Sequence, residues 1–359
     1  MDLMGVRHEG EDVADAMVLH YSNFLGMEHP VETTNMGNLF SNVLSNEDAE
    51  NMIRPVTCEE VKNAMFSIGE DKAPGPDGYT STFFKKAWEI VGNEVTNAVL
   101  QFFENGKLLK QINHTILALL PKKDIPDSVL DYRPISCCNV LYKCISKIIT
   151  DRLKGSLGSL VSINQSAFVP GRKISDNILL TQELMHNYHL NRGPSRCAFK
   201  IDIQKAYDTV NWSFLEDVLG RFGFQHKMVN WIMTCGSTVS YSLCINGNLH
   251  GYFRGKWGLR QGDPMSPYLF TLVMEVLSLL LKRAASMPFK YHAHCAKEKI
   301  INVSFADDLF IFVHGDVVSV KKIKEALEIF TNISVLAPSP AKSTVFFFAM
   351  CHTRFGRKS

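Results

Sequence analysis

A pair of adjacent aspartates, Asp307 and Asp308, constrains this chain more than any other feature, because it lies between two apolar runs. Residues 300–304 precede the pair and residues 309–313 follow it. This pattern predicts a β-hairpin with both carboxylates in its tight turn. Adjacent carboxylates raise each other's pKa unless a cation compensates them, and their hard oxygen ligands suit Mg²⁺. Asp-rich turns also form for backbone reasons alone, and the pair by itself favours that simpler interpretation.

Composition and charge limit the classes of protein that the chain can represent. Its 359 residues are 46% hydrophobic and 21% charged, which predicts a globular chain with two or three subdomains. Residues 1–60 carry two arginines against twelve acids, so this segment has a net charge of −10 and the remainder +12. A basic body favours a polyanionic partner, although scattered surface lysines give the same count.

Targeting signals and membrane segments are not evident. The first residues are acidic and lack the apolar region of a secretory signal, and the longest apolar run is too short to span a bilayer. The nine cysteines lack the paired spacing of a zinc site, which favours reduced intracellular thiols. His292, His294 and Cys295 resemble metal ligands, but no second cluster completes a tetrahedral site, so we expect a surface loop there.

Hydrophobic periodicity places helices and strands along the chain. We expect Thr57 to cap a helix with Glu60 as its capping-box partner, and residues 35–46 to form a linker. Helices are predicted over residues 11–26, 57–68, 83–103, 139–154, 175–190, 212–222, 268–285 and 319–330. Strands are predicted over residues 115–120, 196–203, 238–245, 249–254 and 345–348, beside the hairpin around Asp307.

Several polar residues at the ends of these elements are candidates for function. Asp202 ends a short β run, and a carboxylate in a buried strand needs an explanation that metal ligation would supply. Lys122 and Lys123 follow a predicted strand, and Arg133 precedes a proline. Cationic side chains at such positions can bind phosphate. Residues 258–267 form a loop before a helix, where backbone N–H groups can bind an anion. The proline- and glycine-rich loop at 72–78 either contacts a ligand or turns a corner.

Lysines on the predicted helix at 139–154 offer a further basic surface. For each of Lys143, Lys147 and Lys154 taken singly, we prefer a solvated helix face to a phosphate contact.

Five sequence blocks in this order resemble the reverse transcriptase of LINE-type, non-LTR retrotransposons that are common in plant genomes. The blocks are residues 72–78, 132–136, 165–168, 260–264 and 305–308, with Asp202 placed 105 residues before Asp307. The combination is far more specific than any single block. The resemblance extends from about residue 55 to residue 348, and residues 12–26 look like the linker that follows the endonuclease in such polyproteins.

The resemblance implies an α+β, right-hand polymerase fold. We expect an acidic linker-like segment at 1–54, fingers at 55–195, a palm with the catalytic aspartates at 196–350 and a truncated tail at 351–359, with the thumb largely absent. The implied activity is RNA-directed DNA synthesis, a nucleotidyl transfer that uses an RNA template, a DNA primer and dNTPs. Nuclear residence would follow from target-primed synthesis, and no membrane association is expected.

The resemblance also assigns roles to single residues. Asp202 and Asp307 would bridge two Mg²⁺ ions, or Mn²⁺ in their place, with Asp308 as an adjacent ligand. Tyr207 would exclude a 2′-hydroxyl and so select deoxynucleotides; an ordinary core tyrosine is less favoured at this spacing from Asp202. The remaining assignments are Lys122 and Arg133 to the triphosphate, Gln261 and Gly262 to the incoming nucleotide, and Lys342 to protonation of pyrophosphate.

Departures from the family pattern keep other functions open. Val335 stands where the family usually has glycine, Ser339 where it has asparagine, and Trp257 where arginine is frequent, yet no metal ligand is lost. We expect no thumb after the palm. The alternative is therefore a catalytically silent retroelement remnant that at most binds nucleic acid, and a maturase-like RNA-binding protein is a third interpretation with no distinguishing residue.

Overall fold

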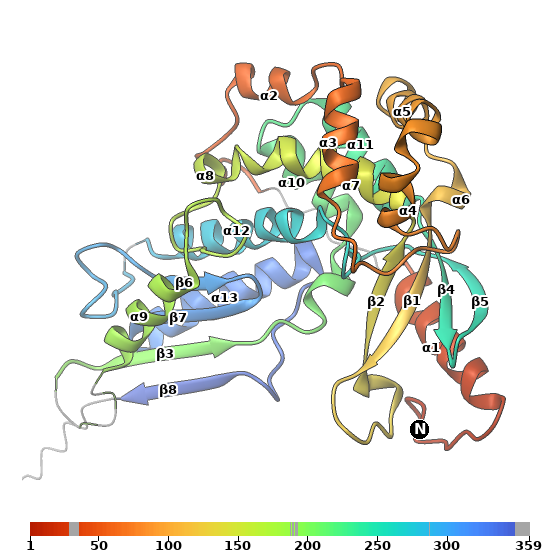
Figure 1. Cartoon of the computed structure of the whole chain (residues 1–359). Coiled ribbons are helices and arrows are strands. Elements are labelled where there is room, and N and C mark those ends of the chain that lie inside the picture. Colours follow the sequence, from red (N-terminus) through yellow and green to blue (C-terminus); the bar gives the residue numbers. More distant parts are fainter. Residues whose placement is uncertain (29–35, 187, 189, 191–192, 287, 349–359) are drawn as a thin grey trace, which may run out of the picture. The chain divides into compact units, whose positions relative to one another are not determined.

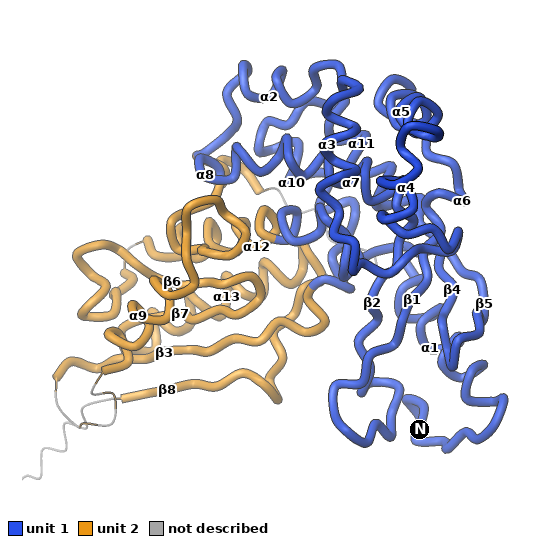
Figure 2. The backbone as a smooth tube through the Cα atoms, in the orientation of Figure 1, with its two compact units in different colours: residues 1–31, 42–160, 207–270 blue, residues 32–41, 161–206, 271–359 orange. Residues whose placement is uncertain are grey.

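The computed structural model describes residues 1–28, 36–186, 188, 190, 193–286 and 288–348. The chain forms two compact units that interleave in sequence (Figure 2). Unit 1 comprises residues 1–31, 42–160 and 207–270, and unit 2 comprises residues 32–41, 161–206 and 271–359. Within the described residues each unit has its own four-stranded sheet together with helices, which confirms the predicted α+β class.

The sheet of unit 1 has the order β2-β1-β4-β5 (Figure 1). Strands β1 (His114–Pro121) and β2 (Tyr132–Cys138) are antiparallel, β1 and β4 (Ser240–Ile245) are parallel, and β4 and β5 (Asn248–Arg254) are antiparallel. Asn246 and Gly247 have φ values of 51° and 82°, as a two-residue hairpin turn requires. The hairpin predicted from these residues is thereby confirmed.

Helices cover this sheet and build the rest of unit 1. Helix α1 (Asp12–Gly26) buries Met17, Tyr21 and Leu25 against strand residues such as Leu117 and Leu243. The other elements are α2 (Asn46–Met52), α3 (Cys58–Ser67), α4 (Ser81–Lys86), α5 (Trp88–Asn105), α6 (Lys110–Asn113), η1 (Val129–Asp131), α7 (Val140–Lys154), α8 (Leu157–Leu160), η2 (Ala206–Thr209), α10 (Trp212–Arg221), α11 (His226–Ser237) and the start of α12 (Ser266–Ala284).

The sheet of unit 2 carries the aspartate hairpin and has the order β6-β7-β3-β8. Strands β3 (Arg196–Ile201), β6 (Asn302–Phe305), β7 (Asp308–His314) and β8 (Thr344–Phe348) pair antiparallel throughout. Helix α9 (Ile174–Met185) packs on β6 and helix α13 (Val317–Ser334) on β7. Leu184 of α9, Ala198 of β3, Val303 of β6 and Phe312 of β7 form a shared core.

Most predicted elements are confirmed, and the differences concern their bounds and a few elements that were not predicted. The helix predicted at 83–103 is divided at Ala87 between α4 and α5, and the helix predicted at 175–190 ends at Met185. Helix α11, strand β2 and the short helices α2, α6 and α8 were not predicted. Of the predicted linker, residue 35 lies outside the described residues, and residues 36–45 form neither helix nor strand.

Two predictions around helix α7 are wrong. Lys143 is not on a solvated face: it is buried, and its Nζ donates a hydrogen bond to the Ala73 carbonyl at 2.6 Å. Glu60 does not complete a capping box. Thr57 does accept from the Glu60 N–H at 3.2 Å, but the Glu60 carboxylate binds the guanidinium of Arg152 at 2.8 Å. In both cases a neighbouring element supplies a partner that local spacing does not reveal.

The loop at 72–78 turns a corner against helix α7. A Cβ on Gly75 would lie 2.3 Å from the backbone nitrogen of Asn139, so glycine is required for this close approach. Asn139 in turn accepts from the Asp77 N–H at 3.2 Å through its Oδ1. The contacts of this loop are therefore with its own unit.

The predicted surface loop at His292 is only partly exposed, which corrects that prediction. His294 is exposed, but His292 and Cys295 are fully buried, and the His292 ring stacks on Tyr188 with 5.9 Å between centroids. Burial lowers the pKa of His292 to about 4, with further lowering by His294, Arg196 and His314. Across the described part of the chain, no group of three His, Cys, Asp or Glu side chains is gathered to hold a metal ion.

The described cysteines are free thiols, and Cys351 lies outside the described residues. Within the same residues, no helix combines the length and apolar character needed to cross a membrane.

Val335 ends helix α13 in a left-handed conformation, with φ 67° and ψ −3°. A β-branched side chain is strained there, whereas glycine is not. We expect Val335→Gly to raise the free energy of unfolding by about 1 kcal/mol, measured by chemical denaturation with circular dichroism. Val318→Gly, at an exposed position with ordinary helical φ in the same helix, should instead lower it slightly. An unchanged or lower stability of Val335→Gly would contradict the strain.

Candidate active site

Three carboxylates meet at one edge of the unit 2 sheet. The register of β3 and β7 places Ile201 opposite Leu309, so Asp202 and Asp308 are the next residues on their strands at that edge. Phe305 pairs with Asp308, which leaves Ala306 and Asp307 as the two-residue turn. Asp307 thus occupies the turn as predicted, while Asp308 is already the first residue of β7.

The electrostatics of this edge favour a bound cation. Asp307 and Asp308 are solvent-accessible and Asp202 is half-buried. Partial desolvation by the surrounding protein raises the pKa of the Asp307 carboxyl. The negative charges of Asp308 and Asp202 raise this pKa further. A divalent ion would relieve this repulsion. The three groups are close enough to interact electrostatically, but in the described residues they are not closed around an ion-sized space.

The segment that carries Lys342 is fixed to the backbone of Asp202. The Asp202 N–H donates to Ser343 Oγ at 3.2 Å, and its carbonyl accepts from the Ser339 N–H at 2.7 Å. Lys342 lies between these two anchors, is exposed, and donates its own N–H to the Ser339 carbonyl at 3.2 Å. Unit 2 therefore brings together the four residues predicted to be catalytic, at the level of the backbone.

Tyr207 is held in unit 1 by an aromatic stack and a backbone contact. Its ring lies 4.5 Å from that of Phe270 at an interplanar angle of 26°, and it remains half-buried. Its carbonyl accepts from the Leu259 N–H at 2.7 Å. Gln261 and Gly262 lie two and three residues after Leu259, so Tyr207 is bonded to the loop predicted to line a nucleotide.

Gln261 and Gly262 occupy the middle of that loop. The Gln261 side chain donates to both carboxylate oxygens of Asp208, each at 2.9 Å, and its carbonyl accepts from the Ser136 N–H at 2.8 Å. Gly262 is exposed with φ 104°, and a Cβ there would lie 3.1 Å from the Ser136 carbonyl oxygen. The loop is thus fastened to η2 on one side and to β2 on the other.

Lys122 and Arg133 lie at the end of the β1–β2 pair where the connecting loop joins the two strands, and both are exposed. The register places Arg133 opposite Leu120, and Lys122 follows β1 directly. The Lys122 ammonium donates to the Leu130 carbonyl at 2.7 Å. Lys123 instead pairs with Asp127 and Asp131, each at 2.9 Å, and its hydrogen bond lowers the pKa of Asp131 to about 2. The Lys123 ammonium is therefore paired with two acids close to it in sequence.

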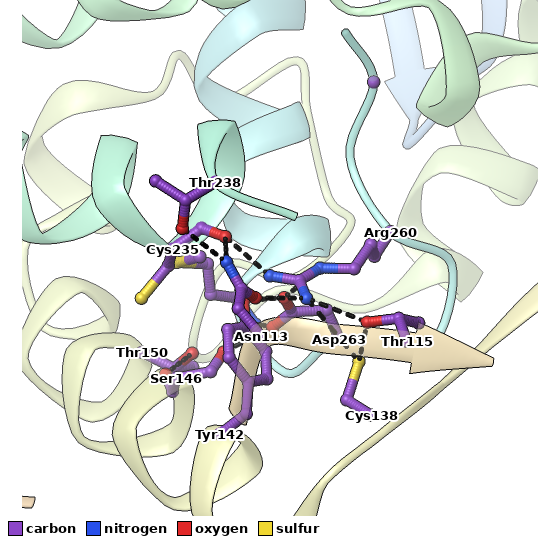
Figure 3. Close-up of polar contacts among 12 residues, drawn as sticks. Asn113, Thr115, Cys138, Tyr142, Ser146, Thr150, Cys235, Thr238, Arg260 and Asp263 are labelled. Atoms are coloured by element: carbon purple, nitrogen blue, oxygen red, sulfur yellow. Dashed lines mark hydrogen bonds and ion pairs between the residues drawn. The ribbon is translucent and has the colours of Figure 1, made fainter. Parts of the chain in front are cut away.

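Sequence reasoning missed a buried polar cluster that supports the same loop (Figure 3). Arg260 and Asp263 flank Gln261 and Gly262, are 5% and 3% exposed, and approach to 3.4 Å. The Arg260 guanidinium donates to Asn113 Oδ1 at 2.8 Å and to the Cys235 carbonyl at 2.7 Å. Asp263 accepts from the hydroxyls of Tyr142 and Ser146. Opposite charges three residues apart around a glycine loop were the signal that could have indicated it.

Glu275 is another buried acid, in the part of α12 that belongs to unit 2. It is 2% exposed, and Ser162 Oγ donates to its Oε2 at 2.9 Å. Burial raises the pKa of Glu275 to about 7, against the lowering effects of Ser162 and Arg172. The unfolded chain releases this proton near pH 4.5 whereas the folded chain keeps it to about pH 7, so stability falls as the pH rises through that window.

We expect Glu275→Gln to remove this pH dependence while keeping an acceptor for Ser162. Since one pKa unit corresponds to about 1.4 kcal/mol, its stability advantage over the unsubstituted chain should be about 2 kcal/mol larger at pH 8 than at pH 5. Denaturation at both pH values, followed by circular dichroism, measures the difference. Glu328→Gln, on the exposed face of α13, serves as the control and should change neither value. Equal effects at the two pH values would refute the assignment.

The sequence of this chain is similar to a known protein family and to several known proteins. The family model for reverse transcriptase (RNA-dependent DNA polymerase) matches residues 120–354, a range that includes every candidate site residue. The chain is 30% identical over 303 residues to the transposon TX1 uncharacterized 149 kDa protein of Xenopus laevis, which covers 84% of this chain and 23% of that protein.

Two further relatives are retrovirus-related Pol polyproteins. The one from the type-1 retrotransposable element R2 of Nasonia vitripennis is 26% identical over 284 residues, or 78% of this chain and 26% of that protein. The one from the type-2 retrotransposable element R2DM of Drosophila melanogaster is 26% identical over 257 residues, or 72% of this chain and 23% of that protein. The chain thus spans about a quarter of the length of these relatives.

Proposed function

We propose that this chain, which belongs to the reverse transcriptase (RNA-dependent DNA polymerase) family, joins deoxynucleotides to a DNA primer on an RNA template within a non-LTR retrotransposon protein. Membership confirms the resemblance drawn from the five sequence blocks; the narrower likeness to plant elements stays a prediction. The observation that carries the proposal is the presence of Asp202, Asp307 and Asp308 at one edge of the unit 2 sheet.

Divalent metal ions are general cofactors of this family, and the acids at this edge fit them. Carboxylate oxygens are hard ligands, and the raised pKa of Asp307 indicates negative charge that a cation would compensate. We assign Asp202 and Asp307 to hold two Mg²⁺ ions, or Mn²⁺ in their place, with Asp308 as an adjacent ligand. Such ions supply Lewis-acid activation of the primer 3′-hydroxyl and stabilise the triphosphate.

The other site residues would orient the nucleotide and move a proton. The stack on Phe270 holds the Tyr207 ring in one orientation, which suits a steric barrier to a 2′-hydroxyl. Gln261 and Gly262 would line the incoming nucleotide. Lys122 and Arg133, both exposed, would bind its triphosphate. Lys342, anchored beside Asp202, would give a proton to the leaving pyrophosphate.

The proposal extends to the organisation of the chain. Fingers at 55–195 and a palm at 196–350 would follow the acidic segment at 1–54. Template-directed synthesis at a chromosomal target would take place in the nucleus.

Primer extension tests the proposal directly. The chain is incubated with a DNA primer annealed to an RNA template, the four dNTPs and Mg²⁺, and we expect primer extension that stops when EDTA removes the metal. Asp202→Asn is the matched control and should give none. A folded chain that binds primer-template in a salt-dependent manner without extending it would overturn the polymerase assignment and favour the silent, nucleic-acid-binding alternative.

A further inference from the structure

The turn that presents Asp307 has an energetically unfavourable backbone conformation. Ala306, the first of its two residues, has φ 54°, and turns of this kind prefer glycine at that place. Ala306 is also only 8% exposed, so its backbone N–H and carbonyl need partners within the protein. Something outside the hairpin must therefore hold this residue.

One side chain satisfies both backbone groups of Ala306. Gln165, which is 1% exposed, accepts the Ala306 N–H through Oε1 at 3.1 Å and donates to the Ala306 carbonyl through Nε2 at 3.4 Å. The same Oε1 accepts the Ala167 N–H at 2.9 Å, which fixes the orientation of the amide group. A glutamine is suited to this task because it offers an acceptor and a donor side by side.

The segment that carries Gln165 is itself held along β6. The Ser304 N–H donates to the Asn164 carbonyl at 2.8 Å, and the Ser166 N–H donates to the Ser304 carbonyl at 3.1 Å. Asn177 of α9 donates to that same Ser304 carbonyl at 2.6 Å. Gln165 is thus placed beside the hairpin by backbone pairing that does not involve Ala306.

A half-buried cation fixes the other side of this segment. The Arg172 guanidinium donates to the carbonyls of Val161, Ser162 and Gln165 at 2.8, 2.5 and 2.7 Å. Three charge-assisted hydrogen bonds to one stretch of backbone define its path. The side chain of Gln165 therefore reaches the turn from a segment that is held by β6 on one side and by Arg172 on the other.

We propose that Gln165 is a positioning residue that holds Ala306 in its left-handed conformation and thereby aims the Asp307 carboxylate at the metal-binding edge. Gln165 touches neither substrate nor metal and acts only through the turn. The catalytic consequence rests on the proposed function, whereas the contact with Ala306 does not.

Two substitutions separate the roles of the amide. Gln165→Ala removes both contacts, and Gln165→Glu keeps the acceptor but replaces the donor. Because a misplacement of about 1 Å can cost about 100-fold in rate, we expect Gln165→Ala to lower kcat for dNTP incorporation about 100-fold with KM for dNTP within about twofold, and Gln165→Glu to fall between. Gln182→Ala, on the exposed face of α9, is the control and should keep the original kcat.

Relief of the turn strain gives a readout that a merely structural residue would not affect. In an Ala306→Gly background, glycine adopts the left-handed conformation without cost, so the loss of kcat caused by Gln165→Ala should shrink at least several-fold. An equal loss in both backgrounds, or a kcat for Gln165→Ala within twofold of the unsubstituted chain, would overturn the proposal.

Hydrogen exchange tests the contact without any catalysis. In metal-free chain, Gln165→Ala should selectively speed exchange in peptides that span residues 302–309, while exchange in β3 and α13 stays unchanged. Unaltered exchange around Ala306, or faster exchange throughout unit 2, would count against Gln165 as the residue that holds the turn. If the unsubstituted chain does not extend a primer, the proposed function fails while the exchange result still decides the role of Gln165.

Discussion

Replacing Asp307 with asparagine is expected to lower kcat for dNTP incorporation at least about 1,000-fold, a loss of about 4 kcal/mol of transition-state stabilisation. Asparagine has the shape of aspartate but lacks the charge that the proposed metal ions require. The turn should remain folded, because Gln165 still binds both backbone groups of Ala306 and the asparagine side chain keeps an acceptor oxygen. Single-nucleotide primer extension at saturating primer-template measures the effect.

Although Asp307→Asn should lower kcat, it should not lower the stability of the metal-free chain. The raised pKa of Asp307 means that its charged form is disfavoured by its surroundings and by Asp308 and Asp202. Removing that charge should therefore leave the metal-free chain as stable as before or slightly more stable at neutral pH. Asp217→Asn, which removes an exposed acid of α10, is the matched control and should change kcat little. A variant at Asp307 that keeps more than a tenth of the activity would contradict the assigned role.

The aspartate hairpin shows why part of this site could be predicted. Apolar runs on both sides of Asp307 predict the two strands of the hairpin, and the antiparallel register then places Asp202 at the same edge. The strands follow from local sequence patterns, and only the pairing of β3 with β7 is needed to bring Asp202 to the hairpin. Gln165 lay in a recognised block, but its contact with Ala306 joins residues 141 positions apart. No local pattern specifies that contact.

The division into units was less accessible from the sequence for a similar reason. Strand β4 pairs in parallel with β1, although the two strands are separated by most of the chain's middle. Residues 207–270 therefore join residues 42–160 in unit 1, whereas the sequence order suggested fingers up to residue 195 followed by the palm. The boundary at 195 stays a prediction. Lys143 and His292 were assigned to the surface because spacing along one helix or loop does not show which neighbours will cover it.

Loss of the buried Arg260 should strongly destabilise unit 1. Arg260→Met keeps much of the side-chain volume but leaves the buried Asp263 without its cation and Asn113 and Cys235 without their donor. Breaking a buried ion pair from one side typically costs about 3–5 kcal/mol, because the remaining charge stays desolvated. We expect a loss of that size in the free energy of unfolding of unit 1.

All four tryptophans of the chain belong to unit 1, so tryptophan fluorescence during chemical denaturation reports on this unit alone. Arg254→Met, on an exposed position of β5, is the control and should change stability by less than about 0.5 kcal/mol. Adding Asp263→Asn to Arg260→Met should recover part of the loss, since the double variant no longer buries an unpaired charge. If the double variant were less stable than the sum of the two single losses predicts, Asp263 would not depend on Arg260. The loop of Gln261 and Gly262 would then owe its position to Ser136 and Asp208 rather than to the buried pair that flanks it.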